Sequence, residues 1–113
     1  MHKRMFSSSL SKAVVGFQSE IRKSFAATEL KAFAKLSDDH NPLHFDESFA
    51  KTTRFKQPIV HGMLVSSLFS GLIAKQWPGN AIYLKQDLKF KAPVFVNEDI
   101  KAKIIVENVE NRK

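Results

Sequence analysis

Hydrophobic residues recur with helical spacing in two parts of the chain. Between residues 28 and 36, Leu30, Phe33 and Ala34 fall on one side of a helix at three- and four-residue intervals. From residue 63 to 74 the chain is apolar nearly all round and is interrupted by serines. A helix that is apolar on all sides is normally buried, so this second helix is expected to lie inside the fold.

Three other stretches alternate apolar and polar residues with a period of two, which indicates strands with one buried face. They cover residues 18–24, 82–90 and 100–106. Pro78 and Gly79 separate the long apolar helix from the second of these stretches and are expected to end that helix. The order is therefore strand, helix, buried helix and two strands.

Composition narrows the class of protein. A length of 113 residues fits one domain, and the absence of cysteine excludes a disulfide framework and thiolate chemistry. No apolar run approaches the roughly 20 residues that a membrane helix needs. The net charge of +7 is compatible with nucleic acid, an anionic membrane surface or a phosphate-bearing substrate. The lysines are spread along the chain and alternate with apolar positions, which indicates solvated faces and is not typical of a nucleic-acid module.

The first 15 residues differ from the rest. They contain Lys3, Arg4, Lys12 and four serines, and they contain no acidic residue. This composition resembles a mitochondrial presequence, and it equally fits a basic start to a bacterial protein. Residues 1–15 are interpreted as an N-terminal extension that precedes the domain at 16–113.

A short polar stretch carries the candidate chemistry. Pro42 disfavours helix at the residue before it, so the segment from Asp38 to His44 is expected to be a turn or loop. On such a loop Asp39 and His44 can fold toward each other and hold one water between a carboxylate and an imidazole. Two alternatives remain open: Asp39 caps a turn beside an ordinary polar histidine, or His40 and His44 bind a metal ion. Pro42 makes the unbroken helix that such a metal pair needs unexpected.

A second stretch places His61 and Gly62 directly before the apolar helix. A glycine at a helix start leaves backbone N–H groups uncovered at the positive end of the helix dipole, where they can hold an oxyanion. The alternative is that Gly62 only permits a tight turn. For His61 the expected role is structural.

Together these stretches resemble the MaoC-like family of R-specific enoyl-CoA hydratases, which includes mitochondrial 3-hydroxyacyl-thioester dehydratases. Residues 39–44 match the hydratase motif D-x-N-P-L-H, and residues 55–63 match the segment that opens the central helix. The resemblance runs from about residue 18 to about residue 106. It implies an α+β hot-dog fold, in which an antiparallel sheet wraps around a long central helix.

The resemblance also implies roles for five residues. Asp39 and His44 hold and activate the water, and Asn41 shapes their loop. The N–H of Gly62 polarises the thioester carbonyl, and Ser70 supports the catalytic pair by hydrogen bonding. The implied reaction is the reversible hydration of trans-2-enoyl thioesters of coenzyme A or acyl carrier protein to (3R)-3-hydroxyacyl thioesters. It requires no cofactor and no metal, and a homodimer without membrane or nucleic-acid partners is expected.

Two departures from the family pattern qualify this interpretation. Asp38 stands where the family often has glycine, and its side chain is expected to point to solvent. The family's last two strands are missing after residue 106, so the domain is expected to be C-terminally incomplete. A non-catalytic acyl-thioester-binding or assembly subunit is therefore the alternative function. The expected location is mitochondrial, with the bacterial cytoplasm as the alternative.

Overall fold

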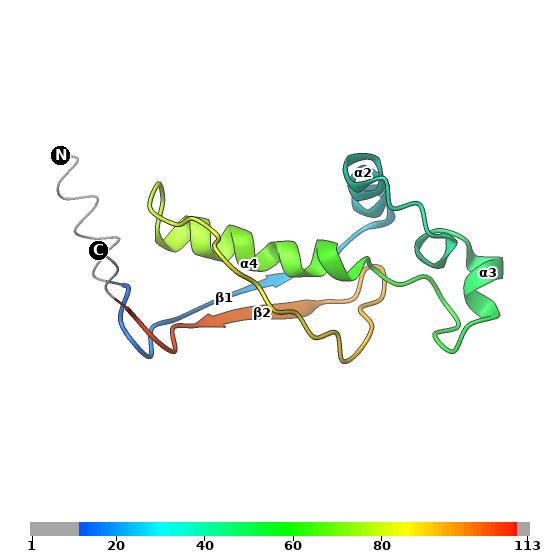
Figure 1. Cartoon of the computed structure of the whole chain (residues 1–113). Coiled ribbons are helices and arrows are strands. Elements are labelled where there is room, and N and C mark those ends of the chain that lie inside the picture. Colours follow the sequence, from blue (N-terminus) through cyan, green and yellow to red (C-terminus); the bar gives the residue numbers. More distant parts are fainter. Residues whose placement is uncertain (1–11, 111–113) are drawn as a thin grey trace. The chain divides into compact units, whose positions relative to one another are not determined.

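The computed structural model describes residues 12–110, which contain two strands, three α-helices and one 3-10 turn (Figure 1). The described residues form two compact units, each assembled from separate stretches of the chain. The first contains residues 12–21, 68–87 and 101–110, and the second contains residues 22–67 and 88–100. In chain order the elements are β1 (Gln18–Lys23), α2 (Ala27–Ser37), η1 (Pro42–His44), α3 (Glu47–Lys51), α4 (Gly62–Gln76) and β2 (Ile100–Ile105).

Strands β1 and β2 pair in an antiparallel two-stranded sheet, as the period-two pattern at residues 18–24 and 100–106 predicts. Beyond one end of the sheet, the N–H of Gly16 donates to the Val106 carbonyl at 2.8 Å and the N–H of Val106 donates to the Phe17 carbonyl at 2.9 Å. Ala102 on β2 is buried, whereas its charged neighbours Lys101 and Lys103 are exposed. The alternation therefore separates a covered face from a solvated one.

In the first unit, the C-terminal half of α4 is attached to the start of β1 by one side chain. Gln76 donates to the Ser19 hydroxyl at 2.9 Å and accepts from the Lys12 ammonium at 3.1 Å. Trp77 packs its ring edge-on against Phe17, with 5.7 Å between the ring centroids. The helix ends at Gln76, directly before the stretch that contains Pro78 and Gly79.

The strand predicted at residues 82–90 is not present. Residues 81–90 form no strand, and Ile82 and Leu84 are 84% and 77% exposed. A period-two pattern reports the sides on which successive side chains lie, but a strand also needs a backbone partner. No described strand pairs with this segment, so the prediction was wrong for the backbone pairing of these residues.

The second unit has a small core formed by α2, α3 and the segment before α4. Its fully buried apolar side chains are Phe25, Leu30, Ala34, Ala50 and Val60. Residues 88–100 join this unit through backbone bonds: the N–H of Val60 donates to Val94 at 2.7 Å, and the N–H of Asn97 donates to Phe25 at 2.8 Å. The unit is thus tied together by main-chain groups from three separate stretches.

Helix α2 is closed by a side chain at its start and by an unusual residue at its end. Glu29 accepts from the N–H of Ala26 at 3.0 Å and from the Lys23 ammonium at 2.8 Å, and the Lys23 contact lowers the pKa of Glu29. At the other end Asp38 adopts a left-handed conformation with φ of 63°, and its N–H donates to the Ala34 carbonyl at 2.8 Å. Glycine is favoured at this position because it has no Cβ. The side chain of Asp38 is 96% exposed, as expected.

Among residues 12–110, no helix has both the length and the apolar character that crossing a membrane requires. The predicted basic extension at residues 1–15 lies largely outside the described residues, since residues 1–11 are not described.

The backbone at Asp38 generates a prediction about stability. Asp38→Ala keeps the Cβ in the left-handed region and loses the short polar side chain that makes this conformation tolerable. Asp38→Gly removes the Cβ altogether. We expect Asp38→Gly to be at least about 1 kcal/mol more stable than Asp38→Ala. Urea denaturation of both variants measures the difference, and equal stability would show that the residue is not strained.

Candidate active site

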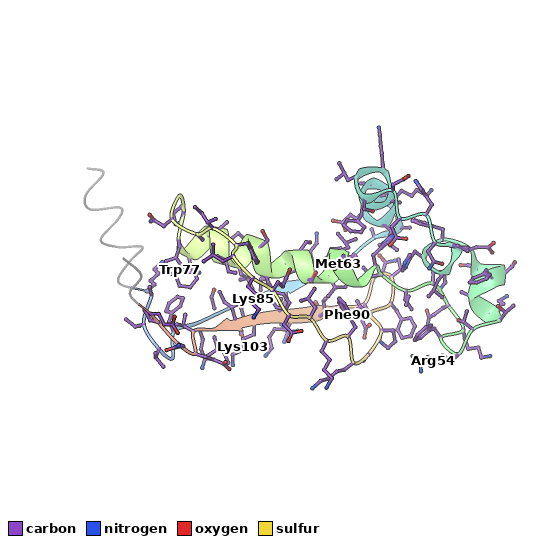
Figure 2. All side chains as sticks on the ribbon, viewed as in Figure 1. Arg54, Met63, Trp77, Lys85, Phe90 and Lys103 are labelled. Carbon is purple, nitrogen blue, oxygen red and sulfur yellow. The ribbon has the colours of Figure 1, made fainter. Side chains whose placement is uncertain are left out.

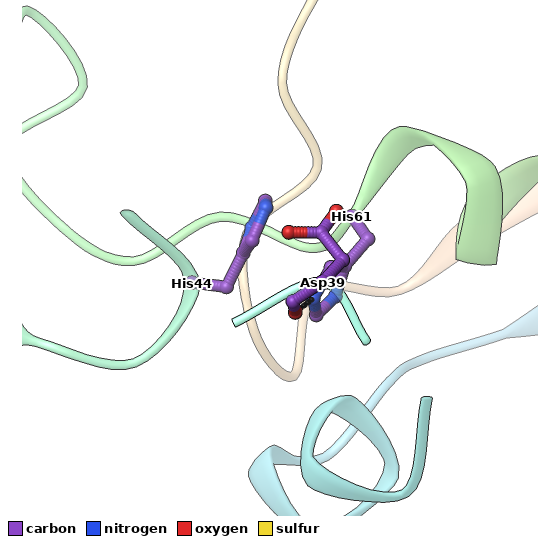
Figure 3. A group of neighbouring side chains, drawn as sticks. All are labelled: Asp39, His44 and His61. Carbon is purple, nitrogen blue, oxygen red and sulfur yellow. Dashed lines mark hydrogen bonds between the residues drawn. The ribbon is translucent and has the colours of Figure 1, made fainter. Parts of the chain in front are cut away.

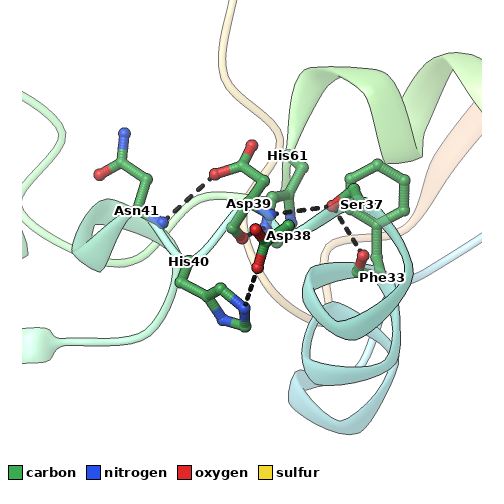
Figure 4. Close-up of polar contacts among 7 residues, drawn as sticks. All are labelled: Phe33, Ser37, Asp38, Asp39, His40, Asn41 and His61. Carbon is green, nitrogen blue, oxygen red and sulfur yellow. Dashed lines mark hydrogen bonds and ion pairs between the residues drawn. The ribbon is translucent and has the colours of Figure 1, made fainter.

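The loop between α2 and η1 is shaped by its own side chains (Figure 4). The N–H of Asp39 donates to the Ser37 hydroxyl at 3.2 Å, and the N–H of Asn41 donates to Oδ1 of Asp39 at 3.2 Å. The Asn41 side chain then accepts from the N–H of Leu43 at 3.0 Å and caps η1, which begins at Pro42. The loop uses one oxygen of Asp39, and Oδ2 has no hydrogen-bond partner among the described residues.

His44 lies at the end of η1 with its tautomer defined by a backbone group. Its Nδ1 is 2.7 Å from the carbonyl oxygen of Ile59. A carbonyl only accepts hydrogen bonds, so Nδ1 carries the proton and Nε2 of the neutral ring keeps a free lone pair. Figure 3 shows the Asp39 carboxylate pointing toward this ring. The structure therefore brings Asp39 and His44 together, as the sequence predicts.

A third side chain, His61, joins this pair. Each of Asp39, His44 and His61 offers a nitrogen or oxygen atom, and these atoms lie within 4.8 Å of one another. Nε2 of His61 is 3.1 Å from the backbone carbonyl of Asp39 and donates to it. The His61 and His44 rings stack with 3.8 Å between centroids and 26° between planes. His61 thus contacts both members of the predicted pair.

The His61 ring is almost completely enclosed, with 1% of the residue exposed. The rings of Phe33 and Phe45 meet it edge-on, at centroid distances of 4.9 Å and 5.6 Å. Burial lowers the pKa of His61 below its ordinary value of 6.5 because it disfavours the imidazolium, and the nearby His44 adds to this effect. The Asp39 carbonyl and carboxylate oppose the shift and do not reverse it.

Gly62 is the first residue of α4, and its N–H donates to no acceptor in the described part of the chain. The ring of Phe90 packs against it: a Cβ at Gly62 would lie 2.8 Å from Cε1 of Phe90. That distance is too short for an ordinary contact, so the present position of the ring depends on the missing side chain. Figure 2 shows Phe90 and Met63 near the start of α4.

Asp39 and Gly62 line the same cleft, whose volume is about 400 Å³. Such a volume is within the usual range for small-molecule sites. His44 is not a lining residue, but it lies beside Asp39, which is one. The walls are mainly apolar, and Arg54 and Lys91 add two cations; the apolar lining consists of Phe55, Ile59, Val60, Met63, Val65, Phe90, Ala92, Pro93 and Val94.

The two remaining predicted residues, Asn41 and Ser70, are not lining residues of this cleft. Asn41 is exposed and caps η1, which agrees with the expectation that it shapes the loop. Ser70 belongs to the other compact unit, where it is exposed and its side chain makes no hydrogen bond to a described residue. Its supporting role therefore stays a prediction.

The close grouping of Asp39, His44 and His61 also raises the question of a metal ion. Two imidazoles that bind one ion must direct their in-plane lone pairs to a common point about 2.0–2.1 Å from each nitrogen. Rings that stack 3.8 Å apart and only 26° from parallel direct those lone pairs along separate lines. His40, the other histidine that the sequence suggested, pairs with Asp38 at 3.2 Å. The geometry favours hydrogen bonding over metal binding.

Comparison with known proteins identifies the family. The family described as MaoC like domain matches residues 6–113. The chain belongs to this family. It is 52% identical over 100 residues to an (R)-specific enoyl-CoA hydratase from Aeromonas caviae, covering 88% of this chain and 75% of that protein. It is 41% identical to a mitochondrial 3-hydroxyacyl-[acyl-carrier-protein] dehydratase from Arabidopsis thaliana, covering 86% of this chain and 59% of that one.

Solved structures agree with the family assignment. The A. caviae (R)-hydratase superposes with a TM-score of 0.82 at 51% identity, over 88% of this chain and 76% of that chain. An R-hydratase from Pseudomonas aeruginosa gives a TM-score of 0.74 at 43% identity, over 84% and 62% of the two chains. The predicted hot-dog fold of this MaoC-like chain is confirmed.

Sequence reasoning missed the contacts of His61 and Phe90. The sequence favours a structural role for His61 and does not predict its contacts with both Asp39 and His44. Phe90 was assigned to a strand, and nothing in its alternation indicates contact with a glycine 28 positions earlier. The available signal for His61 was its position directly before Gly62, because a residue next to the helix start lies close to any group that the helix start binds.

The lowered pKa of His61 predicts how stability depends on pH. Below about pH 6.5 the unfolded chain protonates this histidine and the native chain resists protonation, so the free energy of unfolding falls as the pH falls. We expect His61→Gln to show a shallower loss than the unmodified chain in urea denaturation between pH 7.5 and 5.5. His40→Gln, which alters an exposed histidine in the same loop, is the control and should retain the steep loss. Parallel curves for all three proteins would contradict the assignment.

Proposed function

We propose that this MaoC-like chain catalyses the reversible addition of water to trans-2-enoyl thioesters, giving (3R)-3-hydroxyacyl thioesters. One observation carries the proposal: the Asp39 carboxylate faces the His44 ring at a cleft that is also lined by the N-terminal residue of α4. The two hydratase relatives and the dehydratase relative support the choice of reaction.

The proposed chemistry follows from the free atoms of the site. The thioester carbonyl accepts the N–H of Gly62 at the positive end of α4, which makes the β-carbon electrophilic. One water donates to Oδ2 of Asp39 and Nε2 of His44, the two acceptors that the loop leaves free. As the water oxygen bonds to the β-carbon, the pair takes one proton from it. The same pair returns a proton to the α-carbon, so atoms and charge balance over the cycle.

The charge around the cleft supports a phosphate-bearing thioester carrier. Arg54 and Lys91 line it, and neither forms an ion pair with a described carboxylate. The Arg54 guanidinium lies over the Phe55 ring, 4.9 Å from its centroid, which restricts the side chain without neutralising it. Both cations therefore remain available to the phosphates of coenzyme A or of phosphopantetheine on acyl carrier protein.

We also propose that the chain acts as a homodimer, as expected from the resemblance.

For the location of the chain, we propose mitochondria, with the bacterial cytoplasm as the alternative. One relative comes from a bacterium, and the name of another places it in the mitochondria of a plant.

The catalytic assignment is tested by hydration of crotonyl-CoA. We expect Asp39→Asn and His44→Ala each to lower kcat by about 100-fold or more, because each removes one acceptor of the water. Circular dichroism verifies that the variants fold. Unchanged rates would refute the assigned roles. Binding of crotonyl-CoA by the unmodified chain without turnover would instead identify a non-catalytic acyl-thioester-binding subunit.

The carrier proposal predicts an effect on binding that depends on the phosphates. Arg54→Gln and Lys91→Gln should each raise KM for crotonyl-CoA by about 3- to 10-fold, with little change for crotonyl-pantetheine, which lacks phosphate. Lys35→Gln, which alters an exposed lysine of helix α2 that does not line the cleft, is the control. An equal rise in KM for both substrates would exclude phosphate recognition by these cations.

A further inference from the structure

His61 is the side chain that links the two halves of the site. Its Nε2–H bonds to the backbone of Asp39 at 3.1 Å, and its ring covers one face of His44 at 3.8 Å. The first contact restrains the peptide that carries the carboxylate. The second restrains the plane of the imidazole that faces the carboxylate. No hydrogen bond joins the Asp39 and His44 side chains directly, so His61 adds two restraints to the hydrogen bonds that Oδ1 of Asp39 and Nδ1 of His44 already make to the backbone.

The buried position of His61 leaves one of its ring nitrogens without a hydrogen bond. Nδ1 of His61 is buried and has no hydrogen-bond partner among residues 12–110. Buried polar atoms are normally satisfied, and an apolar side chain of similar size would fill the space between Phe33 and Phe45 without leaving a nitrogen unpaired. Packing alone therefore does not account for a histidine here, whereas its hydrogen bond to Asp39 does.

We propose that His61 is a positioning residue for the Asp39–His44 pair, which it holds by donating Nε2–H to the Asp39 carbonyl and by stacking on the His44 ring. This inference rests on the proposed hydration. It extends the assigned machinery to a residue that contacts neither the water nor the thioester.

The charge of His61 matters for this role. The titratable groups that face it are Asp39 in the loop and His44 in η1, while Phe33 of α2 and Phe45 present only aromatic edges. When His44 takes a proton from water, it becomes a cation against the face of the His61 ring. A neutral ring accommodates that cation through its π electrons, whereas a second imidazolium would repel it. Burial, which lowers the pKa of His61, keeps the ring neutral.

Two substitutions separate the hydrogen bond from the stacking. His61→Phe retains a ring and loses the donor, while His61→Gln retains an amide donor at the reach of Nε2 and loses the ring. The exposed His40→Gln is the matched control. All four proteins are compared in crotonyl-CoA hydration as a function of pH, with folding verified by circular dichroism.

The expected results distinguish positioning from packing. His61→Phe should lower kcat by about 10- to 100-fold with KM changed by less than about threefold, because the carboxylate loses its alignment while binding persists. His61→Gln should recover part of kcat and show a changed acid limb in its pH profile, since the ring beside His44 is gone. His40→Gln should match the unmodified chain. Unmodified kcat in folded His61→Phe, or equal losses in both variants with an unmoved acid limb, would overturn the proposal.

A spectroscopic readout separates this inference from the proposed function. The carbonyl carbon-13 signal of Asp39 should shift in His61→Phe and remain near its original position in His61→Gln, whether or not the chain hydrates crotonyl-CoA. An unmodified chain without turnover would refute the hydratase proposal. An Asp39 signal that does not move in His61→Phe would refute the positioning role by itself.

Discussion

The geometry of the site depends on four consecutive residues, 59–62, whose backbone and side-chain groups bond to the loop before them and to the segment 88–100. The carbonyl of Ile59 fixes the His44 ring, and its N–H donates to Leu43 at 3.3 Å. Val60 bonds to Val94, and His61 bonds to the Asp39 carbonyl. Because buried main-chain groups must find partners, an extended segment placed here organises the loop on one side and residues 88–100 on the other. The next residue, Gly62, then starts α4 at a defined point.

In this arrangement each of the two catalytic candidates uses one side-chain atom for a structural hydrogen bond and leaves the other atom free. His44 uses Nδ1 for the backbone and leaves Nε2, and Asp39 uses Oδ1 for Asn41 and leaves Oδ2. The structural bonds also select one tautomer of His44, so the free lone pair is already present before a substrate enters. Catalytic groups that are oriented in advance need little reorganisation during the reaction. The same hydrogen bonds that shape the loop therefore leave one acceptor free on each of Asp39 and His44.

The sequence predicted those features that short-range rules control. As predicted, helix α2 ends before Pro42 and Asp39 and His44 lie close together, and the uniformly apolar stretch forms α4. It did not predict features that depend on contacts between distant residues. The stacking of His61 on His44 joins positions 17 apart, and the packing of Phe90 on Gly62 joins positions 28 apart. The alternation at residues 82–90 predicted a strand that the structure does not contain. Alternation indicates the directions of side chains, and it does not show whether a hydrogen-bonded partner strand is present.

Asp38 shows how a local departure from the family pattern is accommodated. The left-handed turn after α2 determines where the chain leaves the helix, and therefore where Asp39 begins. Glycine adopts this conformation most easily, but aspartate also tolerates it. The Asp38 carboxylate points to solvent and meets His40 at 3.2 Å, away from Asp39. A second carboxylate that faced inward would place two negative charges side by side in the candidate site, where they repel each other. The positive φ thus directs the additional charge outward and leaves the Asp39–His44 pair with a single carboxylate.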